Sequence, residues 1–232
     1  MKIIIAPTKT MDIKKSKFLV DTTPLFEKDA KKIMSKLKKK TKKALSDIYN
    51  IKSKVLDKTY DYIQKDHESG HAIMSYTGLA YKNLDIGSLS KQDFDYLNNY
   101  VYILDSLYGL LRPSDLITYY RLDFNTELDI NLYSYWDKVC NYIQDDVIVN
   151  LASKEYSKMI KKDMINIHFK EEQNNKFINK ATYSKQARGT MLNFIVKNRI
   201  KNPINIKNFN ELGYIFNDKL SNETNYVFTR KA

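Results

Sequence analysis

The opening strand of the chain is the sequence feature that most constrains its fold. Residues 2–6 form a short apolar run with three successive isoleucines, and Pro7 stops it. Such a run predicts a buried strand, because apolar side chains on both of its faces favour burial over contact with water. Three polar residues follow at once, Thr8, Lys9 and Thr10. A polar loop after a buried strand is a favourable position for a binding site, so we expect this segment to contribute to one.

Helical patterns dominate the first quarter of the chain and recur later. A Thr-Pro start with an acidic first turn predicts a helix from Thr23 to about Leu37. Ser90 and Asp93 resemble a capping box, which predicts a helix over residues 90–100. Further helical patterns cover residues 42–48, 55–65 and 184–199.

Short apolar and β-branched segments predict strands between these helices. Residues 165–170 and 177–181 are joined at Asn174-Asn175, which predicts a hairpin. The alternation of elements, without a repeat or a linker, predicts one mixed α/β (α+β) domain over residues 1–232, with short mixed strands surrounded by helices. The remaining predicted strands cover residues 2–6, 72–76, 101–104, 120–124, 147–151, 214–216 and 226–230.

Composition excludes several classes of protein. Hydrophobic residues make up 43% of the chain and charged residues 28%, as in globular domains, while six Gly and four Pro exclude collagen-like and flexible-linker chains. No apolar run approaches the ~18 residues of a membrane helix, and the first residues lack a signal-peptide core. Cys140 is the single cysteine and cannot form an internal disulfide. We therefore expect a water-soluble, cytoplasmic protein with no membrane partner.

The net charge of +12 is unevenly distributed along the chain. Residues 1–65 hold 18 basic and 7 acidic groups, residues 66–148 hold 5 and 13, and residues 149–232 hold 16 and 7. Such segregation predicts positive potential on the two ends of the chain and negative potential on its middle, unless the fold interleaves them, and it favours a polyanionic partner. The lysine run at residues 31–43 is more simply the solvated face of a helix. Arginine kept against this lysine bias is typical of phosphate or carboxylate binding, and the arginines are Arg112, Arg121, Arg188, Arg199 and Arg230.

Familiar catalytic and nucleotide motifs lack support. Residues 67–71 match the H-E-x-x-H of zinc proteases, but Gly70 and the strand predicted after it end the helix that this motif needs. Three histidines also disfavour Ser-His-Asp and Cys-His catalysis, and Cys140 lies at helical spacing behind apolar residues, which indicates packing. Neither G-x-G-x-x-G nor G-x-x-x-x-G-K-[ST] occurs. We expect no metal and no cofactor, and no catalytic residue is assigned.

Turn-like clusters of Arg, Lys, Tyr and Gly are the strongest candidates for a binding site. A Gly in a turn lets backbone N–H groups approach a phosphate, and a nearby cation adds charge. Each Gly alone is more simply a tight turn, and only their number makes binding an equal alternative. The predicted DNA- or phosphate-binding residues are Lys9, Thr10, Gly78, Gly109, Arg112, Tyr120, Arg121, Lys185, Arg188 and Gly189.

Six segments along the chain carry distinctive motifs. The chain opens with K-I-I-I-A-P-T-K-T, and Y-T-G-L-A and L-Y-G-L-L-R-P-S-D-L-I follow. Y-R-L-D-F, N-L-A-S-K-E-Y and K-Q-A-R-G-T-M come after them. Together these segments resemble the YaaA family of peroxide stress proteins, whose motifs in the same order are I-S-P-A-K-T, Y-x-G-L, L-Y-G-x-L-R-P-x-D-L, P-Y-R-L-E-M, N-L-A-S-x-E-Y and K-x-A-R-G-x-M. Ala6 replaces the Ser of the family's first motif, and the resemblance extends from Met1 to about Arg230.

This resemblance implies a cytoplasmic protein of the peroxide response that limits free intracellular iron and thereby Fenton damage to DNA. It also implies a single-domain α/β fold with a positive cleft and a helix-hairpin-helix element that binds double-stranded or branched DNA without sequence specificity. Such a hairpin has the pattern h-x-G-h and offers backbone N–H groups to phosphate. Residues 107–110 and residues 76–79 both fit it, so two placements stay open.

Two functions from different classes are left open. A DNA-protecting protein would line its basic cleft with Lys9, Arg112, Arg121, Lys185 and Arg188. An enzyme acting on a small phosphorylated or nucleotide-like ligand would use Lys9, Tyr120, Arg121 and Glu155. A deep, compact pocket favours the enzyme, and an open groove as wide as a duplex favours the DNA-binding protein. A weaker third alternative is direct iron binding by Asp85, Asp123 and Glu127.

Overall fold

A computed structural model describes residues 1–231, and its sheet is built around strand β1 (Lys2–Ile5). β3 (Val101–Asp105) and β6 (Ile148–Asn150) pair with the two edges of β1, and both are parallel to it. The three isoleucines of β1 are at most 7% exposed. The predicted buried first strand is therefore confirmed, and it lies inside a parallel sheet, where both faces of a strand are covered.

Across residues 1–231 the sheet has eight strands in the order β4-β3-β1-β6-β7-β10-β9, with β8 beside β7. The five strands from β3 to β10 in this order are parallel, whereas β4, β8 and β9 are antiparallel additions. This topology confirms the mixed α/β class. The remaining strands are β4 (Gly109–Leu111), β7 (Ile165–Gln173), β8 (Lys176–Ile178), β9 (Ile215–Phe216) and β10 (Asn225–Lys231), and a separate pair is formed by β2 (Gly70–His71) and β5 (Leu116–Ile117).

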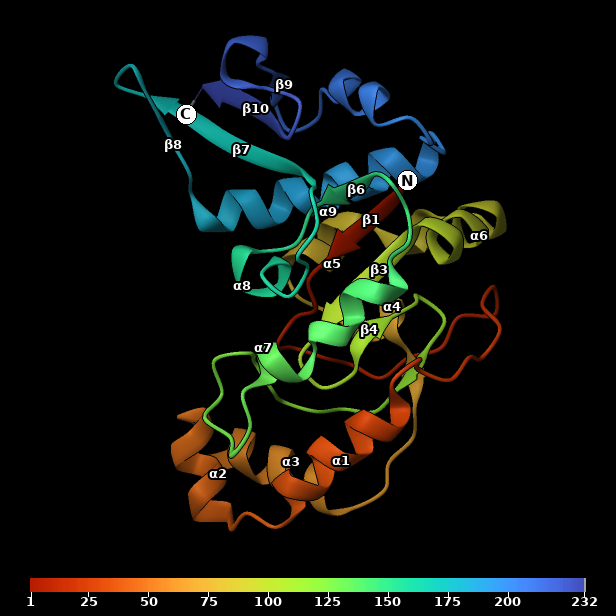
Figure 1. Ribbon diagram of the computed structural model, residues 1–232, viewed down its shortest axis with the longest axis vertical. Helices are drawn as coiled ribbons and strands as arrows, with labels where there is room; N and C mark the ends of the chain where they lie inside the picture. The colour runs from red at the N-terminus through yellow and green to blue at the C-terminus, as the bar shows by residue number, and fades with distance from the viewer. Residues whose placement is uncertain (232) are drawn as a thin grey trace.

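The longer helices lie around this sheet, and the first three form a group at the lower end of Figure 1. They are α1 (Glu27–Lys38), α2 (Lys42–Tyr49) and α3 (Ser53–Gln64). α5 (Leu79–Leu84) packs against α9 (Ala181–Lys197), and α6 (Lys91–Tyr100) packs against strand β3 of the sheet. Short helical turns complete the set: α4 (Ala72–Ser75), α7 (Leu132–Tyr135), α8 (Lys154–Ser157), η1 (Ile86–Ser88), η2 (Asp137–Tyr142), η3 (Pro203–Asn208) and η4 (Asp218–Leu220). Within residues 1–231, no helix combines the length and apolarity needed to span a bilayer.

Local signals in the sequence account for several of these elements. The capping box at Ser90 and Asp93 is present, since each residue's side chain accepts a hydrogen bond from the other's backbone N–H. Asn174 and Asn175 both have positive φ, at 51° and 59°, as the tight turn between β7 and β8 requires. The predicted helix at 90–100 and the predicted hairpin are therefore confirmed.

Two predictions in the first half of the chain are wrong. Residues 72–76 are predicted as a strand, but Ala72–Ser75 forms one helical turn, α4. A short apolar run fits either element, and β2 ends directly before it. The first helix is predicted to start at Thr23, but α1 begins at Glu27. The Thr23 carbonyl instead accepts a hydrogen bond from Arg112 at 2.8 Å.

A third predicted element, the strand at residues 120–124, is also wrong. These residues form no strand within the described part of the chain. Their alternation serves burial instead, because Tyr120, Leu122 and Phe124 are each at most 5% exposed in the core. The alternation of buried and less buried side chains therefore arises from an extended loop with one face packed against the core, not from a strand.

The two open placements of the helix-hairpin-helix turn differ in the structure. Residues 107–110 lie in the hairpin between β3 and β4, so the first placement is wrong. Residues 76–79 connect α4 to α5 and therefore lie between two helices. A DNA contact at this second turn stays a prediction.

The close packing of α5 against α9 is made possible by Gly189. A Cβ atom at this position would lie 1.9 Å from the carbonyl oxygen of Ala80 and 2.8 Å from its carbonyl carbon. Backbone atoms cannot move aside as a flexible side chain can. The glycine therefore sets the distance between the two helices.

Gly189→Ala is expected to lower the free energy of unfolding by about 1–3 kcal/mol, because the added methyl group must push α5 away from α9. Urea denaturation followed by circular dichroism measures this change. Gly87→Ala is the matched control, since a Cβ there meets nothing within 4 Å. Equal stability of the two variants would contradict the assignment.

Candidate functional site

A pocket of about 540 Å³ opens where β1 and β6 end. Ile5, the last residue of β1, and Leu151, directly after β6, both line it. In the sheet, β3 lies on one side of β1 and β6, which comes later in the sequence, lies on the other side. Ligands of open parallel sheets bind at such a point, beyond the carboxyl ends of the strands, where the direction of strand order reverses.

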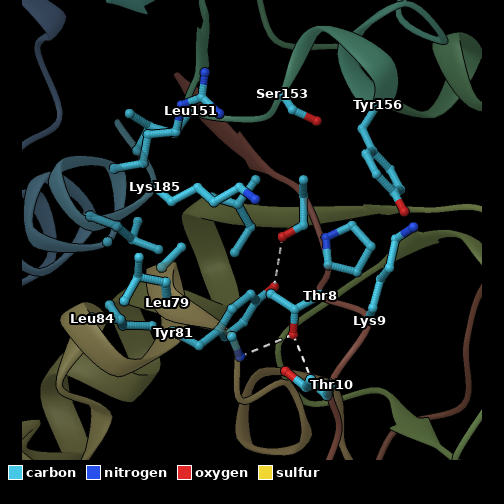
Figure 2. A pocket seen from close by; sticks show the side chains of 18 of the residues that line it. Thr8, Lys9, Thr10, Leu79, Tyr81, Leu84, Leu151, Ser153, Tyr156 and Lys185 are labelled. Atoms are coloured by element: carbon cyan, nitrogen blue, oxygen red, sulfur yellow. Dashed lines mark hydrogen bonds between the residues drawn. The ribbon is translucent and has the colours of Figure 1, made fainter. Parts of the chain in front are cut away.

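Four segments distant in sequence, together with Asp123, form the pocket walls (Figure 2). The loop after β1 contributes Thr8 and Lys9, and α9 contributes Lys185, whose side chain extends across the pocket in Figure 2. The lining is mixed, with apolar residues from α5 and polar residues from the segment after β6. The other lining residues include Leu79, Ala80, Tyr81, Leu84, Ser153, Glu155, Tyr156, Thr182, Arg188 and Leu192.

The loop after β1 is held against the start of α5 by short hydrogen bonds. Thr8 Oγ1 donates to the carbonyl of Thr10 at 2.8 Å and accepts from the Gly78 N–H at 3.2 Å. The Tyr81 hydroxyl donates to the Ala6 carbonyl at 3.1 Å. A Cβ at Gly78 would lie 2.4 Å from Thr8 Cγ2, so only glycine permits this approach. The loop is therefore fixed before any ligand binds.

Arg188 is the most unusual cation of the pocket. Its Nε is buried and has no hydrogen-bond partner among residues 1–231. Burial lowers the pKa of Arg188, but a guanidinium stays charged in proteins at physiological pH. A buried charged donor without an acceptor is costly, so the side chain is suited to an anion that enters the pocket.

The other two cations differ in how they are held. Lys185 is exposed, and no carboxylate lies within 4.0 Å of it in the described part of the chain. Lys9 Nζ instead lies 2.6 Å from Asp123 Oδ2, where the carboxylate is only 19% exposed. Lys9 thus neutralises an acid at the pocket rim. The direct positive field in the pocket comes from Lys185 and Arg188.

The structure brings six of the ten predicted site residues to this pocket. They are Lys9, Thr10, Gly78, Lys185, Arg188 and Gly189. Their roles differ, because Gly78 and Gly189 permit close packing while the cations and Thr10 present polar groups. Glu155, named with the alternative function, also lines the pocket. Binding by any of these residues stays a prediction.

The other four predicted residues lie elsewhere. Gly109 is a buried hairpin residue with φ +70°, and a Cβ there would lie 2.6 Å from the Trp136 ring. Arg112 is held by Asp115, at 2.7 Å from Nη2, and by the Thr23 carbonyl. These two residues do not line the pocket.

Tyr120 and Arg121 lie beside a smaller neighbouring cavity of about 10 Å³. The Tyr120 hydroxyl donates to the buried Asp105 carboxylate instead of pointing at the main pocket. Thr8 and Lys9 line both this small cavity and the main pocket, so Tyr120 and Arg121 lie near the main pocket.

The H-E-x-x-H segment does not lie on a continuous helix. α3 ends at Gln64, and His71 belongs to β2, where it accepts a hydrogen bond from the Ser16 N–H at Nδ1 and pairs through Nε2 with Asp21. His67 stacks on Tyr62. Among residues 1–231, no group of three His, Cys, Asp or Glu side chains is placed to hold a metal ion, and this includes the three acids considered for iron.

Comparison with known proteins assigns the chain to a family. The model of the family described as peroxide stress protein YaaA matches residues 1–220. The chain belongs to the YaaA family. A UPF0246 protein from Agathobacter rectalis is 35% identical over 100% of this chain and 99% of its own length. UPF0246 proteins from Fusobacterium nucleatum and Finegoldia magna are each 37% identical over at least 98% of both chains.

Several pocket residues of this YaaA-family chain were missed by sequence reasoning. Tyr81, Ser153 and Tyr156 line the pocket but do not belong to the predicted site. The rule that selected the loop after β1 would have found Ser153 and Tyr156, because they follow the predicted strand at residues 147–151 by two and five residues. Tyr81 gave no such signal, since a tyrosine in a helix is usually a packing residue.

A buried acid organises the loops on both sides of the site. Asp105, at the end of β3, is 0% exposed and accepts hydrogen bonds from the hydroxyls of Tyr76 and Tyr120. The backbone N–H groups of Leu107 and Tyr108 also donate to it, each at 2.8 Å. Burial nevertheless raises the pKa of Asp105. Its partners connect the turn before α5 with the loop at residues 120–124.

Tyr120→Phe is expected to lower the free energy of unfolding by about 1.5–3 kcal/mol, because Asp105 loses one donor in a fully buried site. Thermal and urea unfolding of the purified variant measure the loss. Tyr142→Phe serves as control, since Tyr142 is 51% exposed and its hydroxyl has no hydrogen bond within residues 1–231. A loss no larger than in the control would contradict the role of Asp105.

Proposed function

We propose that this YaaA-family protein acts in the peroxide response by binding a small phosphorylated or nucleotide-like anion in the pocket. The observation that carries the proposal is the Arg188 guanidinium, which lines the pocket and whose Nε is a buried donor without an acceptor among residues 1–231. A phosphate group bound to this guanidinium would offset its charge, and Lys185 would add a second cation. These two cations support an anion as the ligand.

The size and lining of the pocket favour a small molecule over a duplex. A volume of about 540 Å³ lies within the range of small-ligand sites, roughly 300–1,000 Å³. Leu79, Leu84 and Leu192 provide an apolar wall beside the cations. Such a combination suits a ligand with an apolar body and an anionic end, as in a nucleotide.

Arg188→Ala is expected to weaken binding of inorganic phosphate and of a nucleoside monophosphate by about 10- to 100-fold, because a charge-assisted hydrogen bond is lost. Isothermal titration calorimetry measures the two affinities. Arg188→Lys should recover only part of the affinity, since lysine keeps the charge but lacks the planar fork.

The control for this experiment is Lys91→Ala, which removes an exposed charge on α6 outside the pocket. It lowers the net charge by the same amount and is expected to leave the affinity unchanged. Equal losses in Arg188→Ala and Lys91→Ala would indicate general electrostatic attraction and overturn the proposed site.

In the cell, the proposed role is to lower free iron during peroxide exposure. The family description as a peroxide stress protein supports the coarser part of this role. Chelatable iron can be measured by electron paramagnetic resonance in cells that lack the protein and carry either the natural chain or Arg188→Ala. The natural chain should lower the iron signal, and the variant should not.

A second candidate function, DNA binding, is favoured by a different surface. Lys28, Lys32, Lys36 and Lys39 are spaced three or four residues apart, so they follow one side of α1 and its C-cap. Ala30, Ile33 and Leu37 are buried on the opposite side. Within residues 1–231, none of the four lysines lies within 4.0 Å of a carboxylate. We call these four residues the α1 lysine stripe.

Replacement of Lys28, Lys32 and Lys36 by Ala is expected to weaken binding of a DNA duplex equally on unrelated sequences. Each lost phosphate contact should reduce the slope of log affinity against log salt by about 0.9. Fluorescence anisotropy across a salt series measures both quantities. Arg188→Ala is the matched comparison, because retention of duplex binding there separates the stripe from the pocket. An unchanged salt slope in the triple variant would exclude the stripe as the DNA contact.

A further inference from the structure

Glu155 is the one pocket acid that no neighbouring side chain engages. It belongs to α8, directly beyond the carboxyl end of β6, and lines the pocket with Arg188. Its Oε1 is buried without a hydrogen-bond partner among residues 1–231. An acid in the first turn of a helix can be present only to interact with the helix dipole, but such an interaction does not require the carboxylate to leave water. The buried, unpartnered oxygen indicates a further role.

The surroundings of Glu155 favour its protonated form. Burial raises the pKa of Glu155 most strongly, and the charge of Asp123 raises it further. Lys9 opposes this effect, as do the Phe124 backbone and Lys158. Lys9 is already engaged by Asp123 at 2.6 Å, which limits what it can do for Glu155. The pocket therefore contains one paired carboxylate and one carboxyl group able to carry a proton.

Other titratable groups of the pocket are less suited to exchange a proton. The Tyr81 hydroxyl is committed to the Ala6 carbonyl, and burial raises the pKa values of Tyr81 and Tyr156. Groups that face Glu155 or the shared pocket from other elements are Lys9, Asp123, Tyr133, Lys158, Lys185 and Arg188.

We infer that the Glu155 carboxyl group is the proton donor and acceptor for the anionic ligand held by Arg188 and Lys185. This inference rests on the proposed function. In the forward step the carboxyl O–H bond breaks, the proton passes to an oxygen or nitrogen atom of the ligand, and the electron pair stays on the carboxylate. Return of a proton from the ligand or from water restores the acid. The pocket thus combines an anion site with a general acid, as a site of acid–base chemistry on a phosphorylated compound requires.

The test uses sulfate as the anionic probe, because sulfate mimics phosphate but stays a dianion between pH 4 and pH 8. Carbon-13 NMR of protein labelled at the glutamate carboxyl follows the eight glutamates, and Glu155→Gln identifies the signal of interest. Its titration midpoint is expected above the ordinary value of about 4.3 and should rise when sulfate binds, since a nearby anion disfavours the carboxylate. A midpoint at or below 4.3, or one that sulfate leaves unchanged, would overturn the inference.

Sulfate affinity gives an independent readout. Because the protonated form binds the dianion more tightly, affinity should be highest at low pH. It should fall by up to about tenfold per pH unit as the pH rises through the Glu155 midpoint. Glu155→Gln should remove this dependence, and Glu223→Gln, an exposed control, should keep it.

The two possible failures are distinguishable. If Arg188→Ala binds sulfate as well as the natural chain, the proposed function fails. If Arg188→Ala loses binding but Glu155→Gln keeps the full pH dependence, the anion site stands and the role of Glu155 is overturned. Absence of sulfate binding by the natural chain would also contradict the anion site, while the NMR midpoint still tests Glu155.

Discussion

The fold depends on the parallel pairing of β1 with a strand on each side. β3 and β6 satisfy the backbone hydrogen bonds of the apolar β1 segment inside the sheet. Because β1 and β6 are parallel neighbours, their carboxyl ends lie at the same edge of the sheet. The pocket opens beyond Ile5, and Pro7 turns the chain away from the strand so that its polar loop lines the pocket.

Charge within the pocket is more informative than charge along the chain. The net charge of +12 arises largely from exposed lysines, and the α1 lysine stripe lies outside the pocket. Inside it, the Arg188 guanidinium and the Glu155 carboxyl group lie on elements that are separated in the sequence by β7 and β8. Each has a buried polar atom without a partner among residues 1–231. Unsatisfied groups of this kind are costly in a folded protein, and they indicate where a ligand would complete the structure.

Elements that depend on interactions between residues close in sequence were predicted correctly, whereas elements that depend on distant residues were not. The capping box at Ser90 and the Asn-Asn hairpin were predictable because residues within four positions determine them. Residues 72–76 and 120–124 were not, since both are apolar segments whose conformation depends on distant partners. Asp105 binds the hydroxyls of Tyr76 and Tyr120, one from each segment, and their burial around this acid replaces strand pairing.

The sequence by itself determined the α/β class, the buried first strand, the family and six of the residues that line the pocket. Only the tertiary structure separated these residues from Gly109 and Arg112, which pack against Trp136 and Asp115. A motif records which residues occur together along the chain, but a Gly or an Arg has the same letter in a tight turn, an ion pair or a binding site. The distinction depends on which atoms surround it after folding, and long-range contacts decide that.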